Sequence, residues 1–195
     1  GVRVLRQDPV ECLISFICTS NNHISRITAM IERLCRAFGR RLCCLDARPF
    51  HAFPSLSALT GLPSPHCCRC RRTAACTHLH PPARLGPEGL HQLRTVPYSE
   101  ARRVLRALPG VGAKVADCVC LMALDKAEAV PVDTHVWRIA QQRYGAVLGS
   151  KSLTPRAHQE IGDFFRGLWG PRAGWAQAVL FCADLHKGQE PSGSR

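Results

Sequence analysis

Hydrophobic residues recur at the spacing of an α-helix along most of this chain. The first such stripe consists of Val10, Leu13, Ile14 and Ile17. Asp8 and Pro9 come just before it and provide an N-cap and a proline for the first helical position, so the pattern predicts a helix here. After a break at residues 21–22, a second stripe covers residues 24–38 and ends at Gly39.

Four later stripes repeat this helical spacing. They are Val115, Val119 and Met122; Val136, Ile139 and Ala140; Ile161, Phe164, Phe165 and Leu168; and Trp175, Ala178, Val179 and Cys182. The strict alternation of apolar and polar residues that marks a half-buried strand is scarce. The pattern therefore predicts an all-α fold in which each helix buries one apolar face.

Two segments lack any such period. Residues 61–86 hold four prolines, four cysteines, three histidines and no acidic residue, so they are predicted to be irregular. Residues 188–195 are polar and glycine-containing, and a disordered tail is predicted there. Residues 1–187 are interpreted as one helical region that the irregular segment interrupts.

The composition narrows the range of partners. The chain has 195 residues, of which 46% are hydrophobic, enough for a sizeable core. Its 26 lysines and arginines exceed its 14 acidic residues, so the formal net charge is +12. A chain this basic favours a polyanionic partner, because binding to phosphates releases condensed counterions.

Membrane insertion and secretion find no support in the sequence. The longest apolar stretch, residues 12–18, is far shorter than the roughly 20 residues that a bilayer span requires. The first residues show neither an apolar signal core nor a cleavage site. The twelve cysteines therefore fit a reduced compartment better than a disulfide framework.

The first candidate for chemistry is the glycine-containing turn at residues 108–113. Gly110 and Gly112 are separated by one residue, which allows positive φ angles and points backbone N–H groups outward at the start of the next helix. Such a turn suits a phosphate, although a plain helix–helix connection is the simpler interpretation. Lys114 follows in the first helical turn, where a cation opposes the helix dipole. An amine held there is a usable nucleophile, and a phosphate contact or a surface lysine is the alternative.

Asp133 is the second candidate. It comes nineteen residues after Lys114 and directly precedes a helical stripe, so it is predicted to be an N-cap. A capping carboxylate at the mouth of a site can also assist proton transfer or stabilise a cationic intermediate. The two roles are compatible.

Two pairs at i, i+4 complete the candidates. Cys118 lies one turn after Lys114 on the same helix face, and Gln177 lies one turn before Phe181. A glutamine beside an aromatic ring can recognise a planar heterocycle by hydrogen bonds and stacking. The simpler interpretations are a small buried hydrophobe for Cys118 and an ordinary surface pair for the other two.

Taken together, these segments resemble the eukaryotic 8-oxoguanine DNA glycosylases of the helix-hairpin-helix superfamily. The resemblance lies in residues 108–137 and 170–185, together with residues 6–12 and the Ser-Asn-Asn at residues 20–22. It extends over residues 1–59 and 88–187. The family begins with a β-rich domain that would precede Gly1, so the resemblance implies a fragment that lacks this domain.

The resemblance implies roles for the candidate residues. Lys114 would attack the sugar C1′ of a flipped, oxidised guanine nucleotide and form a Schiff base that permits β-elimination, and Asp133 would support the developing charge and the proton transfers. Cys118 and Phe181 would sandwich the base, Gln177 would bind its edge, and Met122 would line the pocket. Gly110 and Gly112, through backbone amides, and His135 would hold phosphates, while Asn21, Asn22 and Arg26 would fill the gap in the duplex and read the orphaned cytosine.

The same resemblance implies the partner and the setting. The partner would be double-stranded DNA containing oxidised guanine opposite cytosine, bound by a monomer in the nucleus, with the mitochondrion as a second location. No cofactor and no metal are expected. The cluster of cysteines that holds an iron–sulfur centre in related branches does not follow the last predicted helix.

Residues 61–86 depart from the family, which has helical sequence and an aromatic-arginine wedge at this point. A shifted reading frame, an alternative exon or an error in assembling the sequence would produce so abrupt a change in composition. A zinc site is a further interpretation, carried by Cys67, Cys70, Cys76, His78 and His80. Loss of the wedge and of the first domain also leaves open a binding-only module, in which the hairpin holds DNA without catalysis.

Overall fold

The structure is a computed structural model that describes residues 1–20, 22–60, 85–145 and 152–187. In chain order the elements are α1 (Pro9–Cys18), α2 (Ile24–Phe38), β1 (Arg41–Leu45), β2 (Arg48–His51), α3 (Leu56–Thr60), α5 (Gly86–Gln92), α6 (Tyr98–Arg106), α7 (Ala113–Ala123), α8 (Thr134–Tyr144), α9 (Pro155–Trp169), a 3₁₀ turn (Gly170–Arg172) and α10 (Ala173–Lys187). The zinc-site interpretation, the tail prediction and nearly all of the segment predicted to be irregular lie outside the described residues, although Gly86 begins α5.

The first two helices begin and end where the sequence predicts. The Asp8 carboxylate accepts hydrogen bonds from the Val10 and Glu11 amides at 2.9 and 3.0 Å, which caps α1. Gly39 ends α2 for a packing reason, because a Cβ at this position would lie 2.0 Å from the Ala52 carbonyl oxygen. Glycine thus allows the end of the helix to approach the chain leaving β2.

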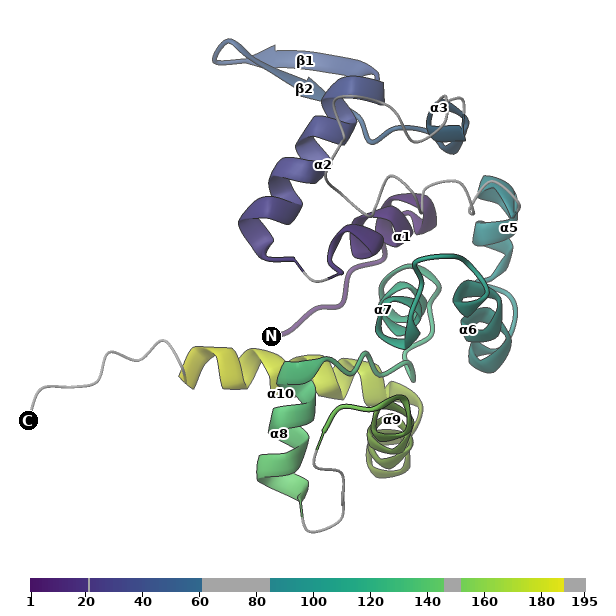
Figure 1. The fold of residues 1–195 in the computed structure, drawn as a ribbon, viewed down its shortest axis with the longest axis vertical. Helices are drawn as coiled ribbons and strands as arrows, with labels where there is room; N and C mark the ends of the chain where they lie inside the picture. Colours follow the sequence, from purple (N-terminus) through teal and green to yellow (C-terminus); the bar gives the residue numbers. More distant parts are fainter. Residues whose placement is uncertain (21, 61–84, 146–151, 188–195) are drawn as a thin grey trace, which may run out of the picture.

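A two-stranded antiparallel hairpin departs from the all-α prediction. β1 and β2 pair Cys43 with Phe50 and Leu45 with Arg48, and the turn between them places Asp46 and Ala47 at positive φ. The hairpin projects beyond the end of α2 (Figure 1). Every residue of β1 is exposed, so no alternating pattern marks it, and its turn lacks the glycine typical of such hairpins. The fold remains mostly helical, as predicted.

Two hydrophobic clusters form the core. The first joins α1, α5, α6 and α7 and includes Leu13, Leu90, Leu105 and Val119, all essentially inaccessible to solvent. The second joins α8, α9 and α10 and includes Val136, Ile161, Phe165 and Ala173. α7 packs on one side against α1 and on the other against α6 (Figure 1). The first residues of α7 are thereby held at the junction of these helices.

The face of α10 that is buried differs from the predicted apolar face, so that prediction is wrong. Trp175 is 45% exposed and its indole N–H donates to the Val2 carbonyl at 3.2 Å, whereas Ala173, Gly174 and Gln177 are buried. Apolar residues occur almost all round this helix, so the helical period alone does not select a face. The choice is made by Gly174, whose amide donates to the Ala127 carbonyl at 2.8 Å.

A buried ionic network connects α7 to α6 and α9. Asp117 is 1% exposed and accepts hydrogen bonds from the Tyr98 hydroxyl at 2.7 Å and from Arg102 Nε at 2.8 Å. His158 Nε2 lies 3.6 Å from the same carboxylate, and Arg166 lies over the Tyr98 ring. Burial lowers the pKa of His158, and burial together with Asp117 raises the pKa of Tyr98. The network connects α7, which carries Lys114, to α6 and α9 through buried polar contacts.

Within the described part of the chain, no helix is long and apolar enough to cross a membrane. The same residues contain no group of three or more side chains of the kinds that ligate metals.

Candidate active site

The turn between α6 and α7 differs in one respect from the prediction. Gly110 adopts φ +79°, but Gly112 is extended, with φ −82° and ψ −179°, and is the N-cap residue of α7. Val111 is buried between the two glycines and its amide donates to the Leu108 carbonyl at 3.1 Å. The side of Gly112 where a Cβ would stand is open to solvent. The first amides of α7 therefore remain available to an anion at the surface.

Lys114 is the second residue of α7 and its side chain reaches the end of α1. Its Nζ lies 3.5 Å from Thr19 Oγ1 and 5.1 Å from the centre of the Phe16 ring. The side chain is partly buried. The site thus places an amine at the N-terminus of one helix and against the C-terminus of another.

Cys118 lies one turn further along α7, as predicted, and is 3% exposed. Burial raises the pKa of its thiol to about 12, the positive charge of Lys114 opposes this rise, and Asp117 and Asp133 add to it. The thiol is therefore protonated at neutral pH and acts as a small apolar surface. The charges of Lys114 and Asp133 both shift the pKa of this thiol, so the two candidate catalytic residues lie in the same region of the molecule.

Asp133 caps α8, as the sequence predicts. Its Oδ1 accepts a hydrogen bond from the Val136 amide at 2.8 Å. The side chain is partly buried, and residues 129–132 before it are fully buried. This packing holds the carboxylate at the start of α8.

The third group of candidates comes from α8 and α10. Gln177 is 6% exposed. The Phe181 ring meets the His135 ring edge to face, with 4.9 Å between centroids. The sequence analysis missed Asp184, whose Oδ2 lies 3.2 Å from His135 Nε2. Its position three residues after Phe181 on the same helix was the available signal.

The remaining predicted residues are Met122 on α7 and three residues at or near the start of α2. Met122 is partly buried and packs against the first core cluster. Asn22 folds inward, where its Nδ2 donates to the Cys18 carbonyl at 3.2 Å and contacts Met30 Sδ at 3.1 Å. Arg26 is exposed on α2, and Asn21 lies outside the described residues.

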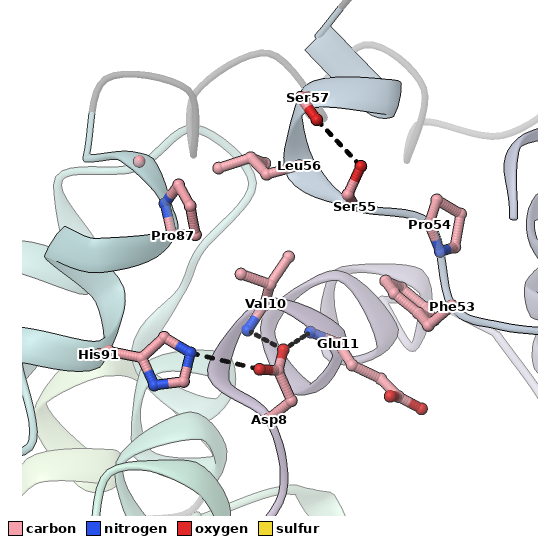
Figure 2. A pocket seen from close by; sticks show the side chains of 11 residues that line it. Asp8, Val10, Glu11, Phe53, Pro54, Ser55, Leu56, Ser57, Pro87 and His91 are labelled. Atoms are coloured by element: carbon pink, nitrogen blue, oxygen red, sulfur yellow. Dashed lines mark hydrogen bonds and ion pairs between the residues drawn. The ribbon is translucent and has the colours of Figure 1, made fainter. Parts of the chain in front are cut away.

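A cavity of about 640 Å³ lies away from Lys114, between the start of α1, α3 and α5. Figure 2 shows Asp8 and His91 at its floor, where His91 Nε2 and Asp8 Oδ2 are 3.3 Å apart. Asp8 is already engaged in capping α1. This cavity therefore belongs to a different part of the molecule from the α6–α7 turn and Lys114.

Comparison with solved structures identifies the class of protein. The 3-methyladenine DNA glycosylase of Archaeoglobus fulgidus matches 94% of the chain with a TM-score of 0.71 at 18% identity, which shows the fold alone. The 8-oxoguanine glycosylase/lyase of Clostridium acetobutylicum, in complex with double-stranded DNA containing cytosine opposite 8-oxoguanine, matches 96% of the chain and 63% of its own with a TM-score of 0.82 and 29% identity. The fold is that of the helix-hairpin-helix DNA glycosylases.

Sequence comparison identifies the family within this class of glycosylases. No family model matches the chain. The N-glycosylase/DNA lyase OGG1 of Arabidopsis thaliana is 42% identical over 192 residues, which are 95% of this chain and 52% of that protein. The N-glycosylase/DNA lyase of Saccharomyces cerevisiae is 35% identical over 215 residues, 95% of this chain and 57% of that protein. The chain belongs to the 8-oxoguanine DNA glycosylase family, and it spans about half the length of these curated relatives.

Proposed function

We propose that this chain carries the catalytic helical part of a DNA glycosylase that removes 8-oxoguanine opposite cytosine and then cleaves the abasic site. The observation that carries the proposal is the position of Lys114 in the first turn of α7, next to the open Gly112 and one turn before the buried Cys118, whose pKa the charges of Lys114 and Asp133 both shift. The names of the two curated relatives and the DNA complex of the bacterial glycosylase/lyase support it.

Lys114 is the nucleophile in this proposal. Its Nζ lone pair forms a bond to C1′ as the bond between C1′ and the base breaks, and the base leaves with that electron pair and takes up a proton. The sugar ring then opens as the nitrogen lone pair forms the second Nζ–C1′ bond of the imine, the bond between C1′ and O4′ breaks, and O4′ takes up a proton. Loss of a proton from C2′ expels the 3′ phosphate, and hydrolysis of the imine restores the lysine. Asp133 stabilises the positive charge that develops on the sugar and the imine.

The base must leave the duplex stack before this chemistry, so a pocket has to receive it. Cys118 and Phe181 would form its two faces, Gln177 would bind its edge, and Met122 would line it. Two observations support this assignment: the Gln177 side chain is buried, and the Phe181 ring of α10 contacts the His135 ring of α8. A protonated thiol suits the face of a planar base because it adds no charge there.

The grip on the duplex combines amides and charges. The backbone amides of Gly110 and Gly112 and the ring of His135 would hold phosphates, while Asn21, Asn22 and Arg26 would enter the gap left by the base. Because Asn22 bonds to the end of α1 in this structure, that role requires its side chain to turn outward. The net charge of +12 accords with a duplex partner, and we propose a monomer that acts in the nucleus and in the mitochondrion.

Borohydride trapping tests the proposal. The protein is incubated with a duplex carrying 8-oxoguanine opposite cytosine, and the imine is reduced to a stable adduct. We expect an adduct with the unchanged protein and none with Lys114→Gln or with Lys114→Arg, which keeps the positive charge and is the control for DNA binding. An adduct that survives Lys114→Gln overturns the assignment of the nucleophile. Equal affinity for damaged and undamaged duplex, with no adduct, selects the binding-only module instead.

A further inference from the structure

The end of α1 contacts the side chain of Lys114 through one hydroxyl group. Thr19 is the residue that caps α1, and its Oγ1 donates a hydrogen bond to the Phe16 carbonyl at 2.7 Å. The same oxygen lies 3.5 Å from Lys114 Nζ, at the long end of the hydrogen-bond range. Hydrogen bonds of this kind in a free enzyme often shorten when substrate binds.

Counting protons shows the direction of this contact. A threonine hydroxyl has a single proton and two lone pairs. Because the proton is engaged with the Phe16 carbonyl, the oxygen can only accept a hydrogen bond from Lys114. An N–H bond of the lysine therefore points toward Thr19, whatever the charge of the amine.

We propose that Thr19 is a positioning residue that turns the lone pair of Lys114 toward the substrate. The inference rests on the proposed function, in which Lys114 attacks C1′. A neutral amine has two N–H bonds and one lone pair, and an N–H bond directed at Thr19 leaves the lone pair on another side of the nitrogen. A hydroxyl free to donate would instead bind the lone pair and mask it.

In this attack, electron pairs and one proton move between Lys114, the sugar and the base. The Nζ lone pair becomes the bond to C1′, the electron pair of the glycosidic bond leaves with the base, and one Nζ proton is transferred to the departing base. Thr19 gains and loses no proton in this step. Thr19 affects only the orientation of the nucleophile. Because the reaction rate depends on this orientation, a small displacement of the amine slows the reaction.

Four variants separate the orientation of the amine from the stability of the helix end. Thr19→Val keeps the shape of the side chain and removes the acceptor, and Thr19→Ser keeps the hydroxyl. Thr95→Val is the matched control, because Thr95 Oγ1 makes the same type of bond, to the Gln92 carbonyl at 2.8 Å, just after the end of α5. Thr19→Ala provides a second acceptor-free variant if the valine disturbs folding.

The measurements are the single-turnover rate of borohydride-trappable adduct formation and the dissociation constant for the same duplex. We expect Thr19→Val and Thr19→Ala to form adduct roughly tenfold more slowly, the effect of one lost hydrogen bond to a reacting group, with unchanged duplex affinity. Thr19→Ser and Thr95→Val should retain the rate of the unchanged protein.

The outcomes distinguish this inference from the function on which it rests. If the unchanged protein forms no adduct, the proposed function fails. If it forms adduct and Thr19→Val does so at the same rate, or if Thr19→Ser is as slow as Thr19→Val, the positioning role of the hydroxyl is overturned and the function stands. A loss confined to duplex affinity also overturns it.

Discussion

Removal of the Asp117 carboxylate tests the buried ion pair with Arg102. Asp117 is 1% exposed and bonds to Tyr98 at 2.7 Å and to Arg102 at 2.8 and 3.3 Å. Asp117→Ala leaves a guanidinium without its anion in a mostly buried position. Breaking such a pair typically costs about 3–5 kcal/mol, largely through the unpaired charge that remains. Since the Arg102 side chain is still 15% exposed and can recover some hydration, we expect a loss near the lower limit, about 3 kcal/mol.

The assay is thermal and urea unfolding followed by circular dichroism. A chain of this size loses about 2–4 °C in Tm per kcal/mol, so the expected shift is roughly 6–12 °C. The control is Glu100→Ala on α6, which breaks an exposed ion pair with Arg103 and should leave the free energy of unfolding almost unchanged.

The double mutant with Arg102→Met completes the cycle. If the cost of Asp117→Ala arises from the unpaired guanidinium, removing both charges should recover much of the lost stability. The reasoning would be refuted if Asp117→Ala lowered the free energy of unfolding by less than about 1 kcal/mol. It would also be refuted if the double mutant lost more stability than the two single mutants lose together.

Two further predictions concern the same helices. Burial lowers the pKa of His158, so the folded chain binds fewer protons than the unfolded chain, and the free energy of unfolding should fall as the pH drops below about 6.5. Urea titrations at several pH values measure this dependence, which should be weaker in His158→Gln; an unchanged pH dependence in the variant would contradict the assignment to His158. In Gly174→Ala the new Cβ would lie 2.1 Å from the Ala129 carbonyl oxygen, so we expect a loss of about 2 kcal/mol, whereas Gly167→Ala on α9, with nothing within 4 Å of its Cβ, should be neutral or stabilising. Equal unfolding midpoints for the two glycine variants would show that α10 moves freely away from the chain at residue 129.

The elements that the sequence predicts best are those whose signals are local. Asp8 and Pro9 before an apolar stripe define the start of α1, and Asp133 defines the start of α8 by the same type of cap. Lys114 and Cys118 could be placed on one face of a helix because four residues make about one turn.

What sequence reasoning missed depends on contacts between distant segments. The hairpin β1–β2 shows no alternation because it is exposed on both faces, and the buried face of α10 is selected by Gly174 against residues 127–129. Asp117, Arg102 and His158 come from three helices, so no spacing along the chain connects them. Thr19 likewise acquires its contact with Lys114 only through the packing of α1 on α7.

The position of Lys114 presents an energetic conflict that the packing of α1 resolves. A cation in the first turn of α7 opposes the dipole of that helix, at a typical cost of 0.3–1 kcal/mol, so a lysine is a poor structural choice there. In the folded chain, however, its Nζ lies against the C-terminal end of α1, where the dipole favours positive charge, and over the Phe16 ring, which attracts a cation. The two helix ends therefore act in opposite directions on one amine. Because α7 begins beside the end of α1, the unfavourable dipole of α7 at the Lys114 amine is offset by the favourable dipole of α1 and by the Phe16 ring.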